Sequence, residues 1–497
     1  MFEKRASGVL VHPTSFPSRY GMGDLGAGAY AFVDFMKNAR QKLWQVLPLG
    51  PTGFGDSPYQ SFSSFAGNHY LISPDELRIQ GWLSDTDLLN IPESNPRRID
   101  YGSVIGYKMK LFKKAFETFK DKATSQHKAK MTKFCTQNKE WLEDYALFTA
   151  LKDHFGGKPW HMWPSNLALR DAKAIEEMRV KLADSVDFCK FLQYEFFRQW
   201  GAIKKYANDV GIKIIGDIPI FVAHDSSDVW ASPELYHLDK KGQPTSVAGV
   251  PPDYFSETGQ LWGNPLYNWD VHKNTDFDWW TKRVKAMLSM MDIIRIDHFR
   301  GFEAYWSVPF GEETAINGKW VKGPGKALFT ALKSKLGDLP IIAEDLGEIT
   351  EKVDKLRTGA GLPGMRVLQF AFTPGANSNY LPHNYCDNLT VVYSGTHDNN
   401  TTVGWYHDAP ESERDYLRRY LNVSGNDVAW DLIRLSFSSN AVFAIVPLQD
   451  IMSLPAADRM NLPGDSQGWW KFRYTPDMLH NDYAERLAYL AGLFHRN

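Results

Sequence analysis

Short apolar segments alternate with helical patterns along the whole chain, and this alternation restricts the fold more than any other feature. Strands that are buried on both faces are continuous apolar runs rich in β-branched residues, as in IIRID. Parallel strands need a crossover connection, which a helix supplies, so eight such strands predict an α/β fold, a (β/α)8 TIM barrel. The expected strands are Gly8–His12, Leu43–Leu49, Ile212–Val222, Ile293–Asp297, Pro340–Glu344, Val367–Phe372, Leu389–Tyr393 and Asn440–Pro447.

An open, doubly wound sheet would give the same alternation and is the second possibility. Its nucleotide-binding versions carry a G-x-G-x-x-G or P-loop pattern directly after a strand. Neither pattern follows any of the expected strands. The barrel is therefore the preferred prediction.

The chain has 497 residues, more than a bare barrel needs, so we expect insertions within one catalytic barrel that spans 1–497. Residues 50–210 follow the second strand and predict a largely helical subdomain, because most of this segment has helical periodicity. Residues 224–278 follow the third strand and are rich in Trp, Tyr and Pro, which predicts an aromatic-rich loop subdomain. Residues 399–438 follow the seventh strand and predict a helical insertion.

The charge is nearly balanced, with 56 basic and 58 acidic side chains and a formal net charge of -2. Such a surface favours neither nucleic acid nor a membrane as a partner. The three cysteines, Cys135, Cys189 and Cys386, lie far apart without disulfide or metal-binding spacing, which suits a reducing compartment. The first residues lack the apolar core of a signal peptide, and no run of about 18 apolar residues occurs. We therefore expect a cytoplasmic protein without a membrane span.

Charged side chains stand at the ends of four of the expected strands. In a barrel these strand ends meet at one mouth, where catalytic groups are usually placed. One such residue could be a structural ion pair or a cap, but charged ends on four strands predict a shared acidic site. The residues are Asp217 on the third strand, Arg295, Asp297 and His298 on the fourth, Glu344 and Asp345 on the fifth, and His397 and Asp398 after the seventh.

Two kinds of chemistry use a ring of carboxylates. One holds a divalent metal, as in lyases and isomerases that stabilise enolates, and the other cleaves a glycosidic bond between two carboxyl groups. Arg295 lies two residues before Asp297. A neighbouring cation weakens metal binding but suits a nucleophile that must stay ionised. The 17 Trp residues would supply platforms for sugar rings, although a large aromatic core would explain them as well. Glycoside chemistry is preferred, and the metal-dependent enzyme stays open.

An ordered set of motifs along the chain resembles the amylomaltases, the 4-α-glucanotransferases of glycoside hydrolase family 77, in their compact bacterial form. The resemblance extends from about Ser7 to the C-terminus and implies an α-amylase-like barrel with retaining transferase activity. The motifs are SFPSRYGMGDLG, GDSPYQSFSSFAGN, GDIPIFVAHDSSDVW, PPDYFSETGQLWGNPLY, RIDHFRGF, AEDLG, SGTHDNNTT and RMNLPG.

The resemblance implies roles for individual residues. Asp297 matches the nucleophile, Glu344 the general acid/base, Asp398 the third carboxylate that holds the distorted sugar, and Arg295 the arginine beside the nucleophile. Phe54 stands where some relatives have tyrosine, which puts a second glucan site in doubt. The implied substrate contacts and supporting positions are Tyr59, Asp217, Asp253, Phe255, Gln260, Trp262, His298, His397, Asn461 and Pro463.

Retention requires two displacements. Asp297 would attack the anomeric carbon while Glu344 protonates the departing oxygen, which requires carboxyl groups about 5–5.5 Å apart. Glu344 must first carry a proton, so an apolar wall or a negative neighbour should raise its pKa. The expected partners are α-1,4-glucans and malto-oligosaccharides, with maltose, maltotriose or glucose as acceptor, and no cofactor or metal is expected. An α-glucan hydrolase with the same site and a non-catalytic glucan-binding protein are the remaining alternatives.

Overall fold

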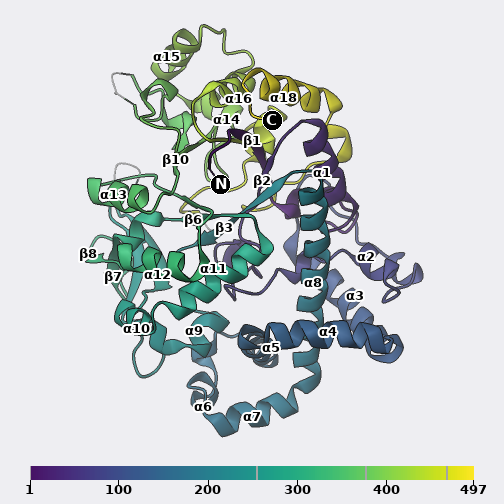
Figure 1. The fold of residues 1–497 in the computed structure, drawn as a ribbon. Helices are drawn as coiled ribbons and strands as arrows, with labels where there is room; N and C mark the ends of the chain where they lie inside the picture. Colours follow the sequence, from purple (N-terminus) through teal and green to yellow (C-terminus); the bar gives the residue numbers. More distant parts are fainter. Residues whose placement is uncertain (1, 253–255, 375–377, 466–467) are drawn as a thin grey trace.

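Eight parallel strands form the centre of the molecule (Figure 1). The computed structural model describes residues 2–252, 256–374, 378–465 and 468–497. The fold is a (β/α)8 barrel, as the alternation of strands and helices predicts. The barrel strands are β1 (Ala6–Leu10), β2 (Leu43–Gln45), β3 (Lys213–Pro219), β6 (Ile293–Asp297), β9 (Ile341–Ala343), β10 (Gly364–Val367), β11 (Thr390–Tyr393) and β12 (Phe443–Pro447).

The first and last strands are neighbours. Strand β1 lies between β12 and β2, with Ala6 opposite Phe443 and Gly8 opposite Leu43. The strand order is β10-β11-β12-β1-β2-β3-β6-β9, so the seam of the barrel lies between β9 and β10. There the N–H of Ala343 donates to the carbonyl of Pro363 at 2.9 Å. The ends of the sheet therefore meet, and all strand ends open at one mouth.

The sixth barrel strand begins earlier than the sequence predicts. We expected it at Val367–Phe372, but β10 ends at Val367 and a 3-10 helix follows over Leu368–Phe370. Leu368 and Phe372 are fully buried. A short apolar run in the core does not distinguish a strand from a buried helical turn, which explains the error.

The segment after β2 folds mainly into helices. Asp100 caps the first long helix by accepting a hydrogen bond from the N–H of Ser103. One apolar face of that helix packs on the longest helix, where Phe191 lies 5.5 Å from Phe116 and 5.1 Å from Phe119. The helices are α2 (Pro74–Ile79), α3 (Tyr101–Lys122), α4 (Ser125–Gln137), α5 (Lys139–His154), α6 (Ser165–Ala168), α7 (Ala172–Lys181) and α8 (Ala183–Asp209).

The remaining helices lie between barrel strands or follow the last one. None of the helices in the described ranges is both long and apolar enough to cross a membrane. They are α1 (Ala27–Asn38), α9 (Ser227–Ala231), α10 (Trp269–Asn274), α11 (Asp278–Met290), α12 (Lys326–Leu336), α13 (Glu351–Gly359), α14 (Thr402–Asp408), α15 (Glu411–Leu421), α16 (Val428–Ser438), α17 (Leu448–Ile451) and α18 (Asn481–Leu493).

A second, antiparallel sheet packs beside the barrel, which the sequence analysis did not predict. Its strands are β4 (Ser246–Val250), β5 (Gln260–Pro265), β7 (Ala304–Pro309) and β8 (Lys319–Lys322), in the order β5-β4-β7-β8. Two of them lie in the aromatic-rich segment that was expected to be a loop. All four strands are short, and β4, β5 and β7 contain Gly or Pro, which weaken the strand signal in the sequence. We refer to this as the small sheet.

Candidate active site

Arg295 on β6 lies between two carboxylates at the mouth of the barrel. Its guanidinium donates to Asp217 Oδ2 at 2.6 Å and forms an ion pair with Asp297 Oδ1 at 2.9 Å. Burial opposes its charge, but Asp217 and Asp297 outweigh burial and hold the pKa of Arg295 well above its usual value. Arg295 and Asp217 are buried, whereas Asp297 is partly exposed to the mouth. The partly exposed carboxylate of Asp297 is therefore paired with the buried guanidinium of Arg295.

Asp217 on β3 is the fully buried one of the two carboxylates that contact Arg295. Burial, followed by the charge of Asp297, raises the pKa of Asp217 to about 6. The hydroxyl of Tyr59 donates to Asp217 Oδ2 at 2.8 Å. Asp217 Oδ1 is buried and has no hydrogen-bond partner among the residues that the structure describes. Tyr59 and Arg295 therefore both support the ionised form of this carboxyl group.

Glu344 directly follows β9, and two backbone groups fix its side chain. The N–H of His298 donates to Oε2 at 2.7 Å, and the N–H of Leu346 donates to Oε1 at 2.8 Å. Burial, followed by the charge of Asp297, raises the pKa of Glu344 to about 8. A carboxyl group with this pKa is mostly protonated at pH 7.

His298 has a left-handed backbone conformation, with φ of 54°. This conformation is uncommon outside glycine, and here it turns the N–H of His298 toward Glu344. The imidazole is packed edge to face with the ring of Trp262, at a centroid distance of 4.7 Å. Burial and the nearby Arg300 lower the pKa of His298 to about 3, so the ring is neutral at physiological pH.

Asp398 lies on the loop after β11, and groups from distant parts of the chain hold it. Asn461 donates through Nδ2 to Asp398 Oδ1 at 2.6 Å, and His397 Nε2 lies 3.3 Å from Asp398 Oδ2. Arg459 donates to the Asp398 backbone carbonyl. The carboxylate stays partly exposed to the mouth.

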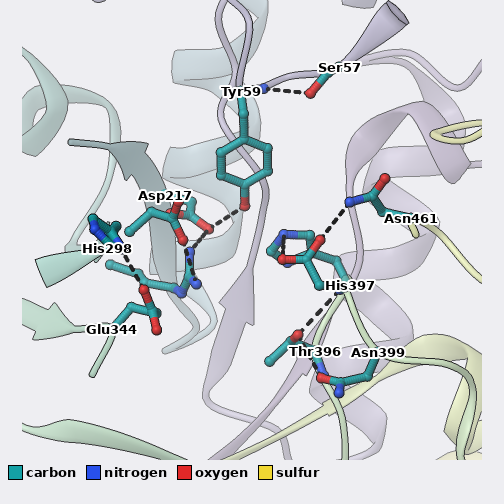
Figure 2. Close-up of polar contacts among 12 residues, drawn as sticks. Ser57, Tyr59, Asp217, His298, Glu344, Thr396, His397, Asn399 and Asn461 are labelled. Carbon is teal, nitrogen blue, oxygen red and sulfur yellow. Dashed lines mark hydrogen bonds and ion pairs between the residues drawn. The ribbon is translucent and has the colours of Figure 1, made fainter. Parts of the chain in front are cut away.

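Tyr59 connects the two sides of the site (Figure 2). Its hydroxyl contacts Asp217, while its ring stacks on His397 with a centroid distance of 5.2 Å and an interplanar angle of 14°. Trp470 packs against both rings, each at 5.9 Å. Trp470 is buried and has a φ of 65°, an uncommon conformation for a large side chain. The indole therefore acts as packing behind the site and not as an open sugar platform.

Asp345 follows Glu344 but points to the seam of the barrel instead of the mouth. Its Oδ1 accepts a hydrogen bond from the N–H of Met365 at 2.6 Å, in the place of a strand-to-strand bond. Arg357 and Arg366 lie 3.2 Å and 3.5 Å from its Oδ2. The pattern of charged strand ends grouped Asp345 with the mouth, whereas the structure places it at the seam, against Met365, Arg357 and Arg366.

The small sheet supplies further residues of the predicted set. Trp262 lies on β5 facing His298 and donates through Nε1 to Gln260 Oε1 at 3.1 Å. Pro463 lies two residues after Asn461 and is exposed. Asp253 and Phe255 lie outside the described residues, and the side chain of Phe54 is also outside the described part.

Two supporting residues, Arg459 and Thr396, were not among the predicted site residues, whereas the core packing expected for Trp470 agrees with its burial. The hydroxyl of Thr396 accepts a hydrogen bond from the N–H of Asp398 at 3.2 Å and donates to Asn399 at 2.8 Å. The Thr-x-Asp spacing is typical of a hydroxyl turn and could have revealed Thr396. Arg459 contacts Asp398 across 61 residues, so no local spacing relates the two residues.

The site therefore brings an arginine-paired carboxylate, Asp297, together with a carboxyl group that carries a proton, Glu344. Double displacement at an anomeric carbon requires a nucleophile and a proton donor of this kind. No group of three or more His, Cys, Asp or Glu side chains in the described ranges is arranged to hold a metal ion.

Comparisons with known proteins agree in one result. A family model described as 4-alpha-glucanotransferase matches residues 11–479. The chain is 49% identical to a 4-alpha-glucanotransferase of Synechocystis, over 100% of this chain and 99% of that protein. It is 50% identical to a 4-alpha-glucanotransferase of Thermus thermophilus, over 98% of each. An amylomaltase from Streptococcus agalactiae, solved in complex with acarbose, superposes with a TM-score of 0.96 at 41% identity, covering 99% of this chain and 100% of that one.

Proposed function

The chain belongs to the 4-alpha-glucanotransferase family, and from this premise we propose how its own residues transfer α-1,4-glucan segments between malto-oligosaccharides. The comparisons give no support to a hydrolase or to a metal-dependent lyase or isomerase.

In the first step, a carboxylate oxygen of Asp297 attacks the anomeric carbon of the donor glucan. The bond between that carbon and the glycosidic oxygen breaks, and Glu344 gives its proton to the departing oxygen. The products are a glucosyl ester on Asp297, a shortened glucan with a free 4-hydroxyl, and ionised Glu344. Arg295 forms an ion pair with the Asp297 carboxylate at 2.9 Å, which can hold this side chain in place for the attack.

In the second step, Glu344 takes the proton of an acceptor 4-hydroxyl, and the acceptor oxygen displaces Asp297 from the anomeric carbon. The electrostatics favour this change of role. The negative charge of Asp297 is one cause of the raised pKa of Glu344, and ester formation removes that charge. The pKa of Glu344 should therefore fall in the intermediate, when it must act as a base.

Asp398 is proposed to hold hydroxyl groups of the distorted sugar, with Asn461 and His397 fixing its two oxygens. Tyr59, Gln260 and Trp262 are proposed to contact the sugars. The same proposal extends to Asp253, Phe255 and Pro463 only through the family resemblance. An enclosed acceptor site that excludes water would favour transfer over hydrolysis.

The observation that carries the proposal is the raised pKa of Glu344 beside a carboxylate that is paired with arginine. A carboxyl group that is protonated at neutral pH can donate its proton to a departing oxygen, which is the task of a general acid.

Azide rescue with an α-maltosyl fluoride donor tests the two roles separately. Fluoride leaves without a proton, so the acid is not needed for the first step. In Asp297→Ala, azide should replace the nucleophile and give the β-azide by one displacement. In Glu344→Ala, azide should attack the enzyme-bound sugar and give the α-azide by two displacements. The opposite stereochemistry, or rescue of neither variant, would refute the assignment.

Product analysis with maltotriose tests transfer itself. The wild type should form glucose together with maltopentaose and longer chains, with maltose, maltotriose and glucose serving as acceptors. Reducing sugar that accumulates without longer products would instead indicate hydrolysis. A cytoplasmic location is also proposed, because Cys135, Cys189 and Cys386 are free thiols.

A further inference from the structure

The outer face of the small sheet carries apolar side chains that the proposed mechanism does not use. Gly249 is opposite Leu261 on one side and Trp306 on the other, and Trp306 is opposite Trp320. Residues directly opposite one another share one face of a sheet. Trp262 has the other orientation and faces His298. The sheet therefore separates the active site from a second aromatic surface.

Several side chains on this surface are unusually accessible for their size. Leu261 and Trp320 are 37% and 38% exposed, and Phe310 and Ile316, on the loop between β7 and β8, are each 52% exposed. The loop is anchored, because Trp306 Nε1 donates to the carbonyl of Ala315 at 2.8 Å. Exposed apolar groups gathered on an ordered surface mark a binding site. We refer to Leu261, Trp306, Phe310, Ile316 and Trp320 as the Trp320 face.

Arg300 connects the Trp320 face to the catalytic strands. Its guanidinium lies 3.8 Å from the ring centroid of Trp320, and it donates to the carbonyl of Glu348 at 2.6 Å. Arg300 follows Asp297 by three residues, and Glu348 follows Glu344 by four. One face of the Trp320 indole is thus fixed against the two loops that leave the catalytic strands.

A second connection joins the loop after β7 to the residues just before β5, the strand that carries Gln260 and Trp262. The N–H of Ala315 donates to the carbonyl of Thr258 at 3.0 Å, two residues before Gln260. Leu261 itself lies between Gln260 and Trp262, which are proposed to contact the sugars. The Trp320 face is therefore continuous with the rim of the proposed substrate cleft.

We propose that the Trp320 face binds an outlying stretch of a long α-1,4-glucan whose other end occupies the active site, an inference that rests on the proposed function. A glucose ring has an apolar face of C–H groups and a rim of hydroxyls. The aromatic and aliphatic side chains suit the first, and the polar groups around them suit the second. These include Lys322, two residues after Trp320 on β8, and the pair formed by Asn317 Nδ2 and Glu312 Oε2 at 2.8 Å.

The size of the surface implies a dependence on chain length. Leu261 and Trp320 lie on the two edge strands, three strand spacings apart, or about 14 Å. Several consecutive sugar rings can lie along this distance. A long glucan that fills the cleft can continue onto this face, so we expect long glucans to gain more from the contact than a trisaccharide does.

Other partners fit this surface less well. Strand β8 is an edge strand with exposed lysines at both ends, Lys319 and Lys322, a pattern that discourages the addition of a strand from another protein. The acidic residues Glu312 and Glu313 on the adjoining loop oppose binding to nucleic acid. A neutral ligand with apolar faces and many hydroxyls matches both features.

Trp320→Ala tests the proposal through the KM for two substrates measured on one enzyme preparation. With long linear amylose, the KM should rise about fivefold, the loss expected for one aromatic stacking contact. With maltotriose, kcat and KM should stay within about twofold of the wild type. Trp320→Phe should restore most of the affinity for amylose. Tyr489→Ala is the matched control, because it removes an exposed aromatic ring on α18.

Equal KM values for amylose in Trp320→Ala and the wild type would overturn the proposal, and so would equal losses with both substrates. If Trp320→Ala does not fold, Ile316→Ser takes its place with the same expected pattern. Sedimentation velocity tests whether a second copy of the chain occupies the face instead. A wild-type dimer that Trp320→Ala dissociates would assign the face to that second copy and refute glucan binding. If the wild type fails to elongate maltotriose, the proposed function fails, and amylose affinity electrophoresis of the two proteins still decides the binding site.

Discussion

The backbone N–H of His298 donates a hydrogen bond to Glu344 Oε2 at 2.7 Å. His298 is the next residue after Asp297, so the neighbour of the proposed nucleophile holds the proposed acid/base. Strands β6 and β9 are neighbours in the barrel, with Ile296 opposite Ala343. Nucleophile and acid are therefore separated by one strand spacing and linked by one peptide group. This arrangement makes the protonation of Glu344 sensitive to the charge on Asp297.

The activity should fall at alkaline pH because Glu344 must carry a proton. Its pKa is raised from 4.5 to about 8, so kcat/KM should be level at neutral pH and decrease about tenfold per unit above pH 8. Between 4.5 and 8 the folded state holds a proton that the unfolded state has released, so this group contributes less stability as the pH rises through that window. Initial rates of maltotriose disproportionation between pH 5 and 10 would measure this alkaline decrease of kcat/KM. A level kcat/KM up to pH 10 would contradict the prediction.

Removing the charge of Asp297 should lower the pKa of Glu344. In Asp297→Asn the second cause of the raised pKa is lost, while burial remains. Carbon-13 NMR of protein labelled at the glutamate carboxyl groups would follow the titration, and Glu344→Gln would identify the resonance. An unchanged midpoint in Asp297→Asn would mean that burial alone sets the pKa and that the proposed change of role lacks its electrostatic basis.

Tyr59→Phe should shift the decrease of kcat/KM at acidic pH to a higher pH. The Tyr59 hydroxyl helps to keep the pKa of Asp217 as low as about 6, so its loss should raise this pKa and protonate Asp217 nearer neutrality. A buried acceptor also loses a partner, which should cost about 1–3 kcal/mol of stability. Tyr206→Phe is the matched control, because its hydroxyl donates to Asp34 at 2.7 Å on the surface. Identical pH profiles for the two variants would exclude the role of Tyr59.

Asn461→Asp should reduce kcat/KM more than Asn461→Ala does. The alanine variant loses the hydrogen bond to Asp398 Oδ1, whereas the aspartate variant adds a like charge 2.6 Å from it. Loss of a hydrogen bond to a charged group predicts a decrease of about ten- to one-hundred-fold for alanine. Asn481→Asp changes a similar surface pair with Glu485 and should have no effect on the rate. Steady-state rates with maltotriose would give the order of the variants.

Asp345→Asn should destabilise the fold much more than Asp354→Asn. Arg357 contacts both carboxylates, but Asp345 is buried whereas Asp354 is 53% exposed. Breaking the buried pair should cost about 3–5 kcal/mol, and breaking the exposed pair less than about 1 kcal/mol. Urea unfolding midpoints would compare them. Similar midpoints for the two variants would show that Asp345 does not hold the seam of the barrel.

The sequence predicts those parts of the fold that rest on local patterns. Strand β6 has the expected bounds, Ile293–Asp297, because a β-branched run ends in charged residues there. The sixth strand was misplaced because the apolar run Val367–Phe372 continues beyond the strand into a 3-10 turn, whereas the strand itself contains Gly364 and Arg366. The small sheet was not predicted because its strands are short and three of the four contain Gly or Pro.

The site was predictable to the level of which loops meet, but not of which way each side chain points. Glu344 and Asp345 are adjacent and chemically alike, yet one faces the mouth and the other the seam. The direction depends on which donors lie nearby, namely His298 for Glu344 and Met365 for Asp345. Contacts such as Asn461 with Asp398 join segments more than 60 residues apart, and only the folded chain brings them together.

The pairing of β1 with β12 has a consequence for synthesis in the cell. Ala6 can find its partner Phe443 only after more than 400 further residues have been translated, which takes roughly 20–90 s at ordinary elongation rates. During that time one edge of β1 is an unpaired apolar template outside the ribosome. The nascent chain must therefore shield this edge, through a chaperone or its own helices, until the last strand emerges and closes the ring.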